Sequence, residues 1–182
     1  MPCPLIQIYI ESILTYLNLQ ATDIANGIEY LHGRSIIHRD LKSPNILMSA
    51  EGVAKISDFN LSKILDDSMM SVCSSAAPCM NPRWLAPELL DGNKPTKSSD
   101  IFSFGVIMWE LLTFEIPWGS ENYWIIVKKL QSGERLKAQH DPHVCPLPTF
   151  EQYCNLMNQC WEQDESKRPT IQNVKRVLNS IR

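Results

Sequence analysis

The sequence predicts a mainly α-helical domain that carries a small patch of β-strands. Three observations indicate this fold class: a long helical pattern ends near residue 32, three short apolar runs follow between residues 35 and 57, and helical patterns return after residue 98. The chain has 182 residues, a length that suits one domain with a sizeable core.

The first helix is expected from about Thr15 to His32. Ile24, Ile28 and Leu31 recur at positions i, i+4 and i+7, which places them on one face of a helix. Gly33 then provides a C-terminal stop. Residues 1–14 fit this pattern poorly, and we treat them as an atypical N-terminal segment.

Three short strands are expected next. The runs SIIH (35–38), NILMS (45–49) and VAKIS (53–57) are short, apolar and bounded by turn residues. The last two runs are joined by a turn at residues 50–52. Residues 62–83 show no periodicity and are rich in Ser, Met, Cys and Pro, which predicts a long loop of the kind that is usually functional or mobile.

The rest of the chain is expected to be helical. Periodic apolar patterns predict helices near 98–113, 120–131, 149–162 and 170–181, with prolines between them. The longest apolar run, residues 101–114, is too short to span a membrane and contains Glu110. We therefore expect a buried helix there and no membrane insertion.

Composition narrows the class of protein. The net charge of −3 and the pI near 5.8 argue against a nucleic-acid platform and against a polybasic membrane anchor. Six cysteines occur without a CxxC pair, and the N-terminus lacks the basic region of a signal peptide. These features predict reduced thiols in a cytoplasmic protein.

Five short strings then need to be read together. They are HRDLKSPN (38–45), DFN (58–60), APE (86–88), SSDIFSFG (98–105) and CWEQDESKRPT (160–170). In this order they resemble the catalytic loop, metal-binding motif, end of the activation segment, central helix and closing motif of a eukaryotic protein kinase.

The resemblance covers residues 15–182 and implies a protein-kinase-like C-terminal lobe, with the catalytic loop at 38–45 and the activation segment at 58–88. It implies phosphoryl transfer from ATP, with Mg²⁺, to a hydroxyl group of a protein substrate. Apart from the nucleotide, no nucleic-acid partner is expected, and the oligomeric state is left open.

The resemblance also implies roles for four residues. Asp40 would be the base that accepts the proton of the substrate hydroxyl, and Lys42 would lie beside the transferred phosphate. Asn45 and Asp58 would hold Mg²⁺, a hard cation that prefers oxygen ligands. Taken singly, each of these residues would better be interpreted as an ordinary turn or surface residue, and only their combination favours the kinase roles.

Three more residues resemble structural supports of the same fold. Asp100, within an apolar helix, would hold the backbone of the catalytic loop and must have hydrogen-bond donors if it is buried. Glu88 and Arg168 would form a partly buried ion pair, for which the planar guanidinium of arginine is well suited. The alternative for the pair is a weak surface contact.

Substrate class follows from the catalytic loop. Lys42 and Ser43 resemble the serine/threonine type, in particular the tyrosine-kinase-like group. The loop that follows offers four candidate phosphorylation sites, with Arg39 as a possible partner of the phosphate: Ser68, Ser71, Ser74 and Ser75. The alternative is a solvated, serine-rich loop.

The sequence departs from the kinase pattern at three places. Asn60 stands where the family has glycine, and Asn81 stands where it has threonine. Only 37 residues precede His38, no lysine precedes Lys42, and no GxG occurs. We therefore expect that the N-terminal lobe is missing, by truncation, and that this chain alone is inactive or very weak.

A second interpretation stays open for this reason. The chain could be a pseudokinase or a protein-binding module made of one lobe, which would contact partners through the surface around Tyr123 to Leu130.

Overall fold

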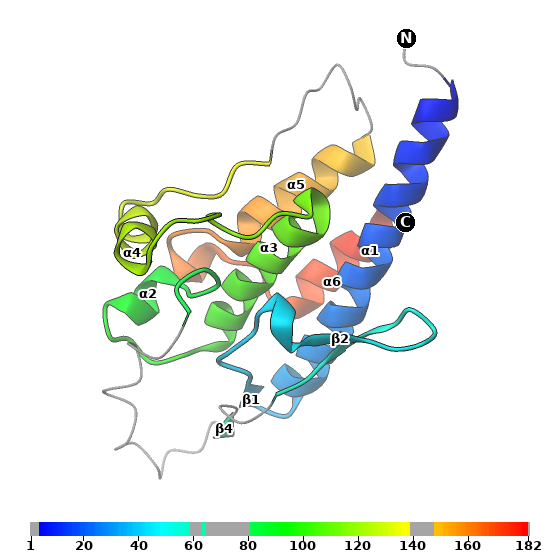
Figure 1. The fold of residues 1–182 in the computed structure, drawn as a ribbon. Coiled ribbons are helices and arrows are strands. Elements are labelled where there is room, and N and C mark those ends of the chain that lie inside the picture. The colour runs from blue at the N-terminus through cyan, green and yellow to red at the C-terminus, as the bar shows by residue number, and fades with distance from the viewer. Residues whose placement is uncertain (1–3, 59–62, 65–80, 139–147, 182) are drawn as a thin grey trace.

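Helix α3 (Lys97–Thr113) lies at the centre of the structure, with the other long helices around it (Figure 1). This computed structural model describes residues 4–58, 63–64, 81–138 and 148–181. Every residue of α3 from 99 to 109 is buried. The helix predicted near residues 98–113 is therefore confirmed, and it forms the core of the domain.

A capping box fixes the start of α3. The Thr96 side chain accepts a hydrogen bond from the Ser99 backbone N–H (3.3 Å), and Ser99 Oγ accepts one from the Thr96 N–H (3.1 Å). These bonds satisfy two donors that a helix start leaves open. Because they fix where the helix starts, they also determine on which side of α3 the next residue, Asp100, lies.

Helix α1 (Pro4–Gly33) is longer than its sequence pattern indicates. The start expected near Thr15 is wrong, because the helix begins at Pro4, a residue whose fixed φ suits the first helical position. The helix packs against α3 and against α6 (Ile171–Ser180). Asn18 Nδ2 donates to the Leu178 carbonyl oxygen (2.9 Å), so the two ends of the chain are joined within the core.

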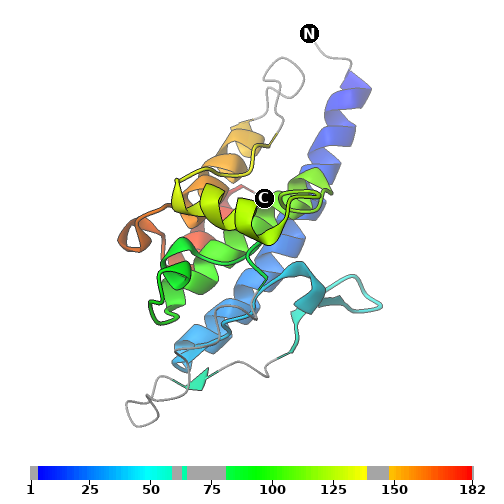
Figure 2. The same cartoon turned by 60° about the vertical axis from the view of Figure 1, so that its left-hand side comes forward.

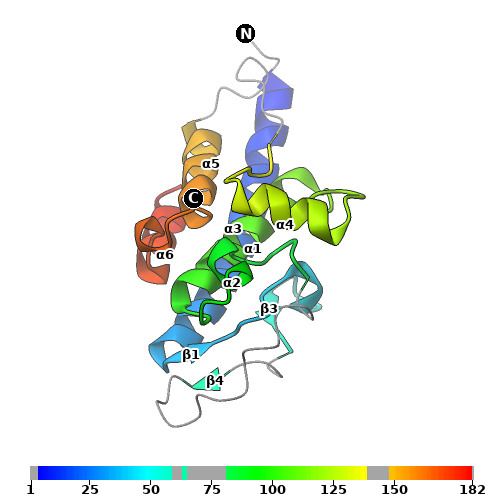
Figure 3. The same ribbon diagram turned by 90° about the vertical axis from the view of Figure 1, so that its left-hand side faces the viewer.

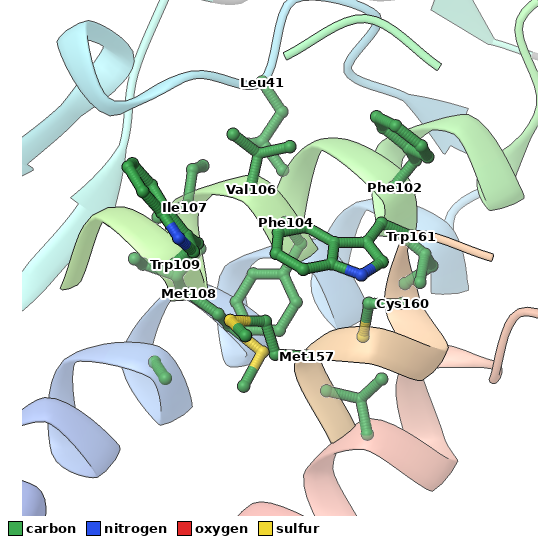
Figure 4. Packing of buried hydrophobic residues seen from close by; sticks show 14 of the residues in the cluster. Leu41, Phe102, Phe104, Val106, Ile107, Met108, Trp109, Met157, Cys160 and Trp161 are labelled. Carbon is green, nitrogen blue, oxygen red and sulfur yellow. The ribbon is translucent and has the colours of Figure 1, made fainter. Parts of the chain in front are cut away.

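Helix α5 (Pro148–Cys160) packs closely on α3. Figure 4 shows Phe104 and Met108 of α3 facing Met157, Cys160 and Trp161. Gly105 permits the close approach, because a Cβ atom placed there would lie 2.9 Å from the Cβ of Cys160. The buried Cys160 thiol has a raised pKa because of its burial, which makes it unreactive.

The strands form two small antiparallel pairs. Strands β2 (Ile46–Met48) and β3 (Ala54–Ile56) pair with Ile46 opposite Ile56, which confirms the predicted hairpin. Figure 2 shows this hairpin beside α1, where Asp23 Oδ2 accepts a hydrogen bond from the Ala54 N–H (3.2 Å).

The second pair joins β1 (Ile36–Ile37) to β4 (Lys63–Ile64), and Figure 3 shows the two strands side by side. Strand β1 lies within the predicted run 35–38. Strand β4 was not expected, since it falls in the stretch predicted as a long loop. Its pairing places Lys63 and Ile64 next to Ile37 and Ile36, the residues that lead into the loop at residues 38–45.

The remaining elements are short or lie at the edge of the domain. Helix α4 (Tyr123–Gln131) contacts the four-residue helix α2 (Pro87–Leu90). Two 3₁₀ turns complete the described part, η1 (Ser43–Asn45) and η4 (Glu165–Lys167). The fold class is thus confirmed as mainly α with a small β patch.

None of the helices described is both long enough and apolar enough to span a bilayer.

Candidate active site

The carboxylate of Asp100 holds the start of the loop at residues 38–45. Asp100 is 2% exposed, and its Oδ2 accepts hydrogen bonds from the His38 backbone N–H and from His32 Nε2, both at 2.9 Å. Its Oδ1 accepts from the Arg39 backbone N–H (3.0 Å). Three donors offset the cost of burying this charge, and two of them fix consecutive peptide units of the loop.

Arg39 has an uncommon backbone conformation as a result. Its φ of 71° lies in the left-handed region, which is unfavourable for a long side chain. Such strain persists only where surrounding contacts enforce it. Here the two hydrogen bonds that the backbone N–H groups of His38 and Arg39 donate to Asp100 enforce it, and they set the direction in which the chain continues to Asp40.

Asp40, Lys42 and Asn45 converge within this loop. Lys42 Nζ lies 2.6 Å from Asp40 Oδ2. Asn45 Nδ2 donates to the Asp40 carbonyl oxygen (2.8 Å) and to Asp40 Oδ2 (3.2 Å). The Asp40 carboxylate is therefore held from two sides, in a single orientation.

Asp58 is brought to the same loop by the residue before it. The Ser57 N–H and hydroxyl group both donate to the Asn45 carbonyl oxygen, at 2.8 and 3.0 Å. His38 Nε2 donates to the Ser57 carbonyl oxygen (3.1 Å). The loop that carries Asp40 and strand β3, which precedes Asp58, thus lie side by side. The hairpin register agrees with this, because it pairs Ile46, just after the loop, with Ile56, just before Ser57.

The oxygen atoms available at this junction suit Mg²⁺. Asn45 is buried, and its amide nitrogen is committed to Asp40, so its Oδ1 is the atom that can bind a cation. Asp58 follows strand β3 with a φ of 60°, a left-handed conformation that aspartate tolerates better than most residues. One amide oxygen and one carboxylate are the kind of set with which proteins bind a Mg²⁺ ion that also contacts phosphate groups.

Asn81 lies close to this loop but is engaged elsewhere. Its Oδ1 accepts a hydrogen bond from the Arg83 N–H (3.2 Å), a local turn contact. Asn81 also lines a cavity of about 10 Å³ together with Asp40, Lys42 and Asp100. A cavity of this volume holds roughly one water molecule, so Asn81 and Asp40 line the same small space.

Glu110 is a member of this region that the sequence analysis did not assign. Its Oε1 accepts a hydrogen bond from Ser43 Oγ and its Oε2 accepts one from Trp84 Nε1, both at 2.7 Å. Burial raises the pKa of the Glu110 carboxyl group, although these two bonds oppose the rise. Glu110 therefore links Ser43, in the loop at residues 38–45, to Trp84, which lies shortly before α2. The signal for it was an acid within the most apolar helix.

Glu88 and Arg168 form a bidentate pair at the base of the same segment. Arg168 Nη1 donates to Glu88 Oε1 (2.6 Å), and Nη2 donates to Oε2 (2.7 Å). Arg168 Nε also donates to the Glu162 carbonyl oxygen (2.8 Å). The arginine side chain is fully buried and that of the glutamate is 10% exposed, so the pair ties α2 to the chain between α5 and α6.

Some of the residues singled out lie outside the described part of the chain. They are Asn60 and the four candidate phosphorylation sites Ser68, Ser71, Ser74 and Ser75.

Comparison with known proteins gives a consistent result. A family profile described as protein tyrosine and serine/threonine kinase matches residues 12–178. The serine/threonine-protein kinase CTR1 of Arabidopsis thaliana is 36% identical over 163 residues, which cover 88% of this chain and 19% of that protein.

Other relatives carry different names. Ephrin type-A receptor 5 of Gallus gallus is 32% identical over 87% of this chain and 15% of its own length. The probable serine/threonine-protein kinase drkD of Dictyostelium discoideum is 34% identical over 87% of this chain and 12% of its own length. The chain thus spans less than a fifth of these relatives. Its profile match and its relatives together show that it belongs to the protein tyrosine and serine/threonine kinase family.

Proposed function

We propose that this chain carries the phosphoryl-transfer residues of a protein serine/threonine kinase that uses ATP and Mg²⁺. The observation that carries the proposal is the junction at Ser57, where hydrogen bonds to Asn45 and from His38 place Asp58 beside the loop of Asp40. Phosphoryl transfer needs an oriented nucleophile and charge stabilisation, which two such segments can supply together.

Asp40 is the proposed base. It accepts the proton of the substrate hydroxyl at its carboxylate, which Lys42 and Asn45 hold in place. Lys42, whose Nζ lies 2.6 Å from that carboxylate, is the proposed cation beside the transferred phosphate. Removing either side chain would disturb the orientation of the nucleophile.

Asn45 and Asp58 are the proposed ligands of Mg²⁺. The ion supplies charge stabilisation for the phosphoryl group that is transferred. The two residues contribute an amide oxygen and a carboxylate, and Ser57, the residue before Asp58, is hydrogen-bonded to the Asn45 carbonyl oxygen. Their part is to hold the metal against the loop of Asp40.

Serine or threonine is the proposed acceptor. Lys42 in the catalytic loop supports this class, and two relatives are named serine/threonine kinases. The family description covers tyrosine kinases as well, so the acceptor needs its own test. Phosphoamino-acid analysis of labelled substrate should yield phosphoserine or phosphothreonine, and phosphotyrosine alone would contradict this assignment.

Arg39 is the proposed partner of a phosphoserine in the activation segment. Within the described part of the chain, its Nε is a buried donor that lacks a hydrogen-bond partner. A phosphate group would supply the acceptor and the opposite charge. Replacing Ser68, Ser71, Ser74 and Ser75 together by alanine should lower the activity of any kinase that contains these residues together with an N-terminal lobe, and unchanged activity would exclude this role.

The metal site can be tested on the 182-residue chain itself. Mn²⁺, a paramagnetic substitute for Mg²⁺, should broaden the NMR signals of residues near Asn45 and Asp58. The D58N and N45A variants should lose this broadening, while D91N, which changes an exposed acid, should keep it. Broadening that is the same in all four proteins would contradict the site.

Activity needs a separate test. We expect the 182-residue chain to bind Mg-ATP far more weakly than an intact kinase and to show negligible turnover. These residues contain no GxG and no lysine before Lys42, so they lack the N-terminal lobe that covers and anchors the nucleotide in a kinase. Micromolar Mg-ATP binding by calorimetry would contradict this. In any kinase that contains these residues together with an N-terminal lobe, D40N should abolish transfer while leaving the fold intact.

A second candidate function is protein binding without turnover, through the surface of α4. Trp124 is 76% exposed there, beside a pocket of about 400 Å³ between α4 and Leu90 of α2. This function is favoured if D40N leaves the activity of the protein in cells unchanged and W124A abolishes it. The kinase function is favoured by the reverse result.

A further inference from the structure

Phe114, the residue at the C-terminal end of α3, combines a strained backbone with an exposed aromatic side chain. Phe114 has a φ of 57° and a ψ of 25°, a left-handed conformation that usually requires glycine or asparagine at a helix end. Its side chain is also 77% exposed. The backbone is strained and the ring buries little surface, so the fold of one chain does not explain why a phenylalanine stands here.

A second exposed apolar side chain and a pocket lie beside Phe114. Ile116 is 68% exposed, and we call these two side chains the 114/116 knob. The pocket has a volume of about 230 Å³ and is lined by Leu112, Thr113, Glu115, Lys137, Ala138 and Phe150. Because Glu115 lies between the two knob residues, the knob and the pocket share one surface.

The charges on this surface complement each other. Glu115 and Lys137 both line the pocket and are both exposed. None of the ion pairs found among the described residues includes either of them. One negative and one positive group on the same face can form two reciprocal pairs when that face meets a copy of itself.

We propose that this face is the contact between two copies of the chain related by a twofold axis. Phe114 of each copy enters the pocket of the other, and Glu115 of each copy pairs with Lys137 of the other. An interface built on so few side chains is small, so the dimer is weak, with a dissociation constant of about micromolar or higher. This inference is independent of catalysis.

The F114G variant tests the knob. Sedimentation velocity of the 182-residue chain over a range of concentrations should show a monomer–dimer equilibrium, which F114G weakens by at least about tenfold. The same variant should keep or raise the melting temperature, because glycine adopts the left-handed conformation without strain. The matched control is W124A, which removes an exposed aromatic side chain on α4 and should leave association unchanged.

Charge exchange tests the reciprocal pairs. E115K and K137E should each weaken association, and the double variant E115K/K137E should restore it, since opposite charges then meet again across the axis. Three results would each overturn the proposal: a wild-type chain that stays monomeric at every concentration, association that F114G leaves unchanged, or a double variant no better than the single ones.

Discussion

Asp100 shows how one buried side chain determines the geometry of the loop at residues 38–45. Its two carboxylate oxygens accept three hydrogen bonds, two of them from the backbone of His38 and Arg39. An asparagine would present an NH₂ group to at least one of these N–H donors. We therefore expect D100N to lower the free energy of unfolding by about 3 kcal/mol, measured by urea denaturation.

The control for Asp100 is D91N. Asp91 is exposed, and its carboxylate accepts a bond from Gln131 (3.2 Å), so this change should stay within about 0.5 kcal/mol. Equal losses in the two variants would mean that the loop is held by other contacts.

Glu110 gives a prediction about pH. Burial raises the pKa of its carboxyl group above the ordinary 4.5, so the folded state binds the proton more tightly than the unfolded chain does. The contribution of Glu110 to the free energy of unfolding should therefore fall as the pH rises from 4.5 through the raised pKa of the folded state. Glutamine can keep both contacts, accepting from Trp84 Nε1 and donating to Ser43 Oγ, but it does not titrate.

The measurement is the difference between E110Q and wild type in the free energy of unfolding, at pH steps from 4 to 7. The difference should shift in favour of E110Q as the pH rises, by less than about 1 kcal/mol because the half-buried carboxylate is still screened by water. The contributions of the other titrating groups are the same in both proteins and cancel in this difference. A constant difference, or a shift in favour of wild type, would exclude a raised pKa.

These residues also show which parts of the site could be predicted from the sequence. Asp40 and Asn45 stand five residues apart on one loop, so local spacing was enough to propose that these two converge, whereas the resemblance to protein kinases was needed to add Asp58, which follows the next hairpin. Glu110 could not be found in this way. Its partners Ser43 and Trp84 lie 67 and 26 residues away along the chain, and only the packing of α3 brings them to it.

At the scale of elements, glycine positions determine how closely helices approach. A Cβ atom at position 105 would lie 2.9 Å from Cys160 Cβ and 3.3 Å from two backbone atoms of α5 and the residue after it. Overpacking there should outweigh the gain in helix propensity, so we expect G105A to destabilise the domain by about 1–2 kcal/mol in urea denaturation.

Gly27 in α1 is the matched control for Gly105. A Cβ atom there would meet the end of the Ile56 side chain at 2.8 Å, and that end can rotate away. G27A should therefore stay within about 0.5 kcal/mol of wild type, because relief of the contact and the gain in helix propensity offset each other. If G105A were as stable as G27A, the close contact between α3 and α5 would not be what requires glycine at position 105.

Elements with a long apolar period were predictable, and elements defined by distant contacts were not. The helix predicted at 98–113 differs from α3 by one residue at its start. Strand β4 exists through its pairing with β1, which a two-residue run cannot reveal. Helix α2 has four residues, fewer than a period needs. The early start of α1 was missed because a run rich in isoleucine does not favour helix over strand.

At the scale of the whole molecule, the domain is closed by contact between its first and last helices. Helix α6 buries Ile171, Val174 and Leu178, and Ile181 follows, in the core shared with α1. Asn18 bonds to the Leu178 carbonyl, and Glu29 pairs with Lys175. Since α1 also carries His32, which bonds to Asp100, this closure supports the loop at residues 38–45 through α1.

Removal of α6 should therefore unfold the domain. Four buried apolar side chains contribute about 6–12 kcal/mol at roughly 1.5–3 kcal/mol each, which equals the whole stability of a typical domain. We expect a chain that ends at residue 169 to lack a cooperative unfolding transition by circular dichroism. Deletion of residues 1–11 is the control, because Ile8 is 59% exposed and the first buried side chain described in α1 is Leu17. That variant should unfold cooperatively, and a cooperative transition in the chain ending at 169 would show that α1 and α3 hold the loop without α6.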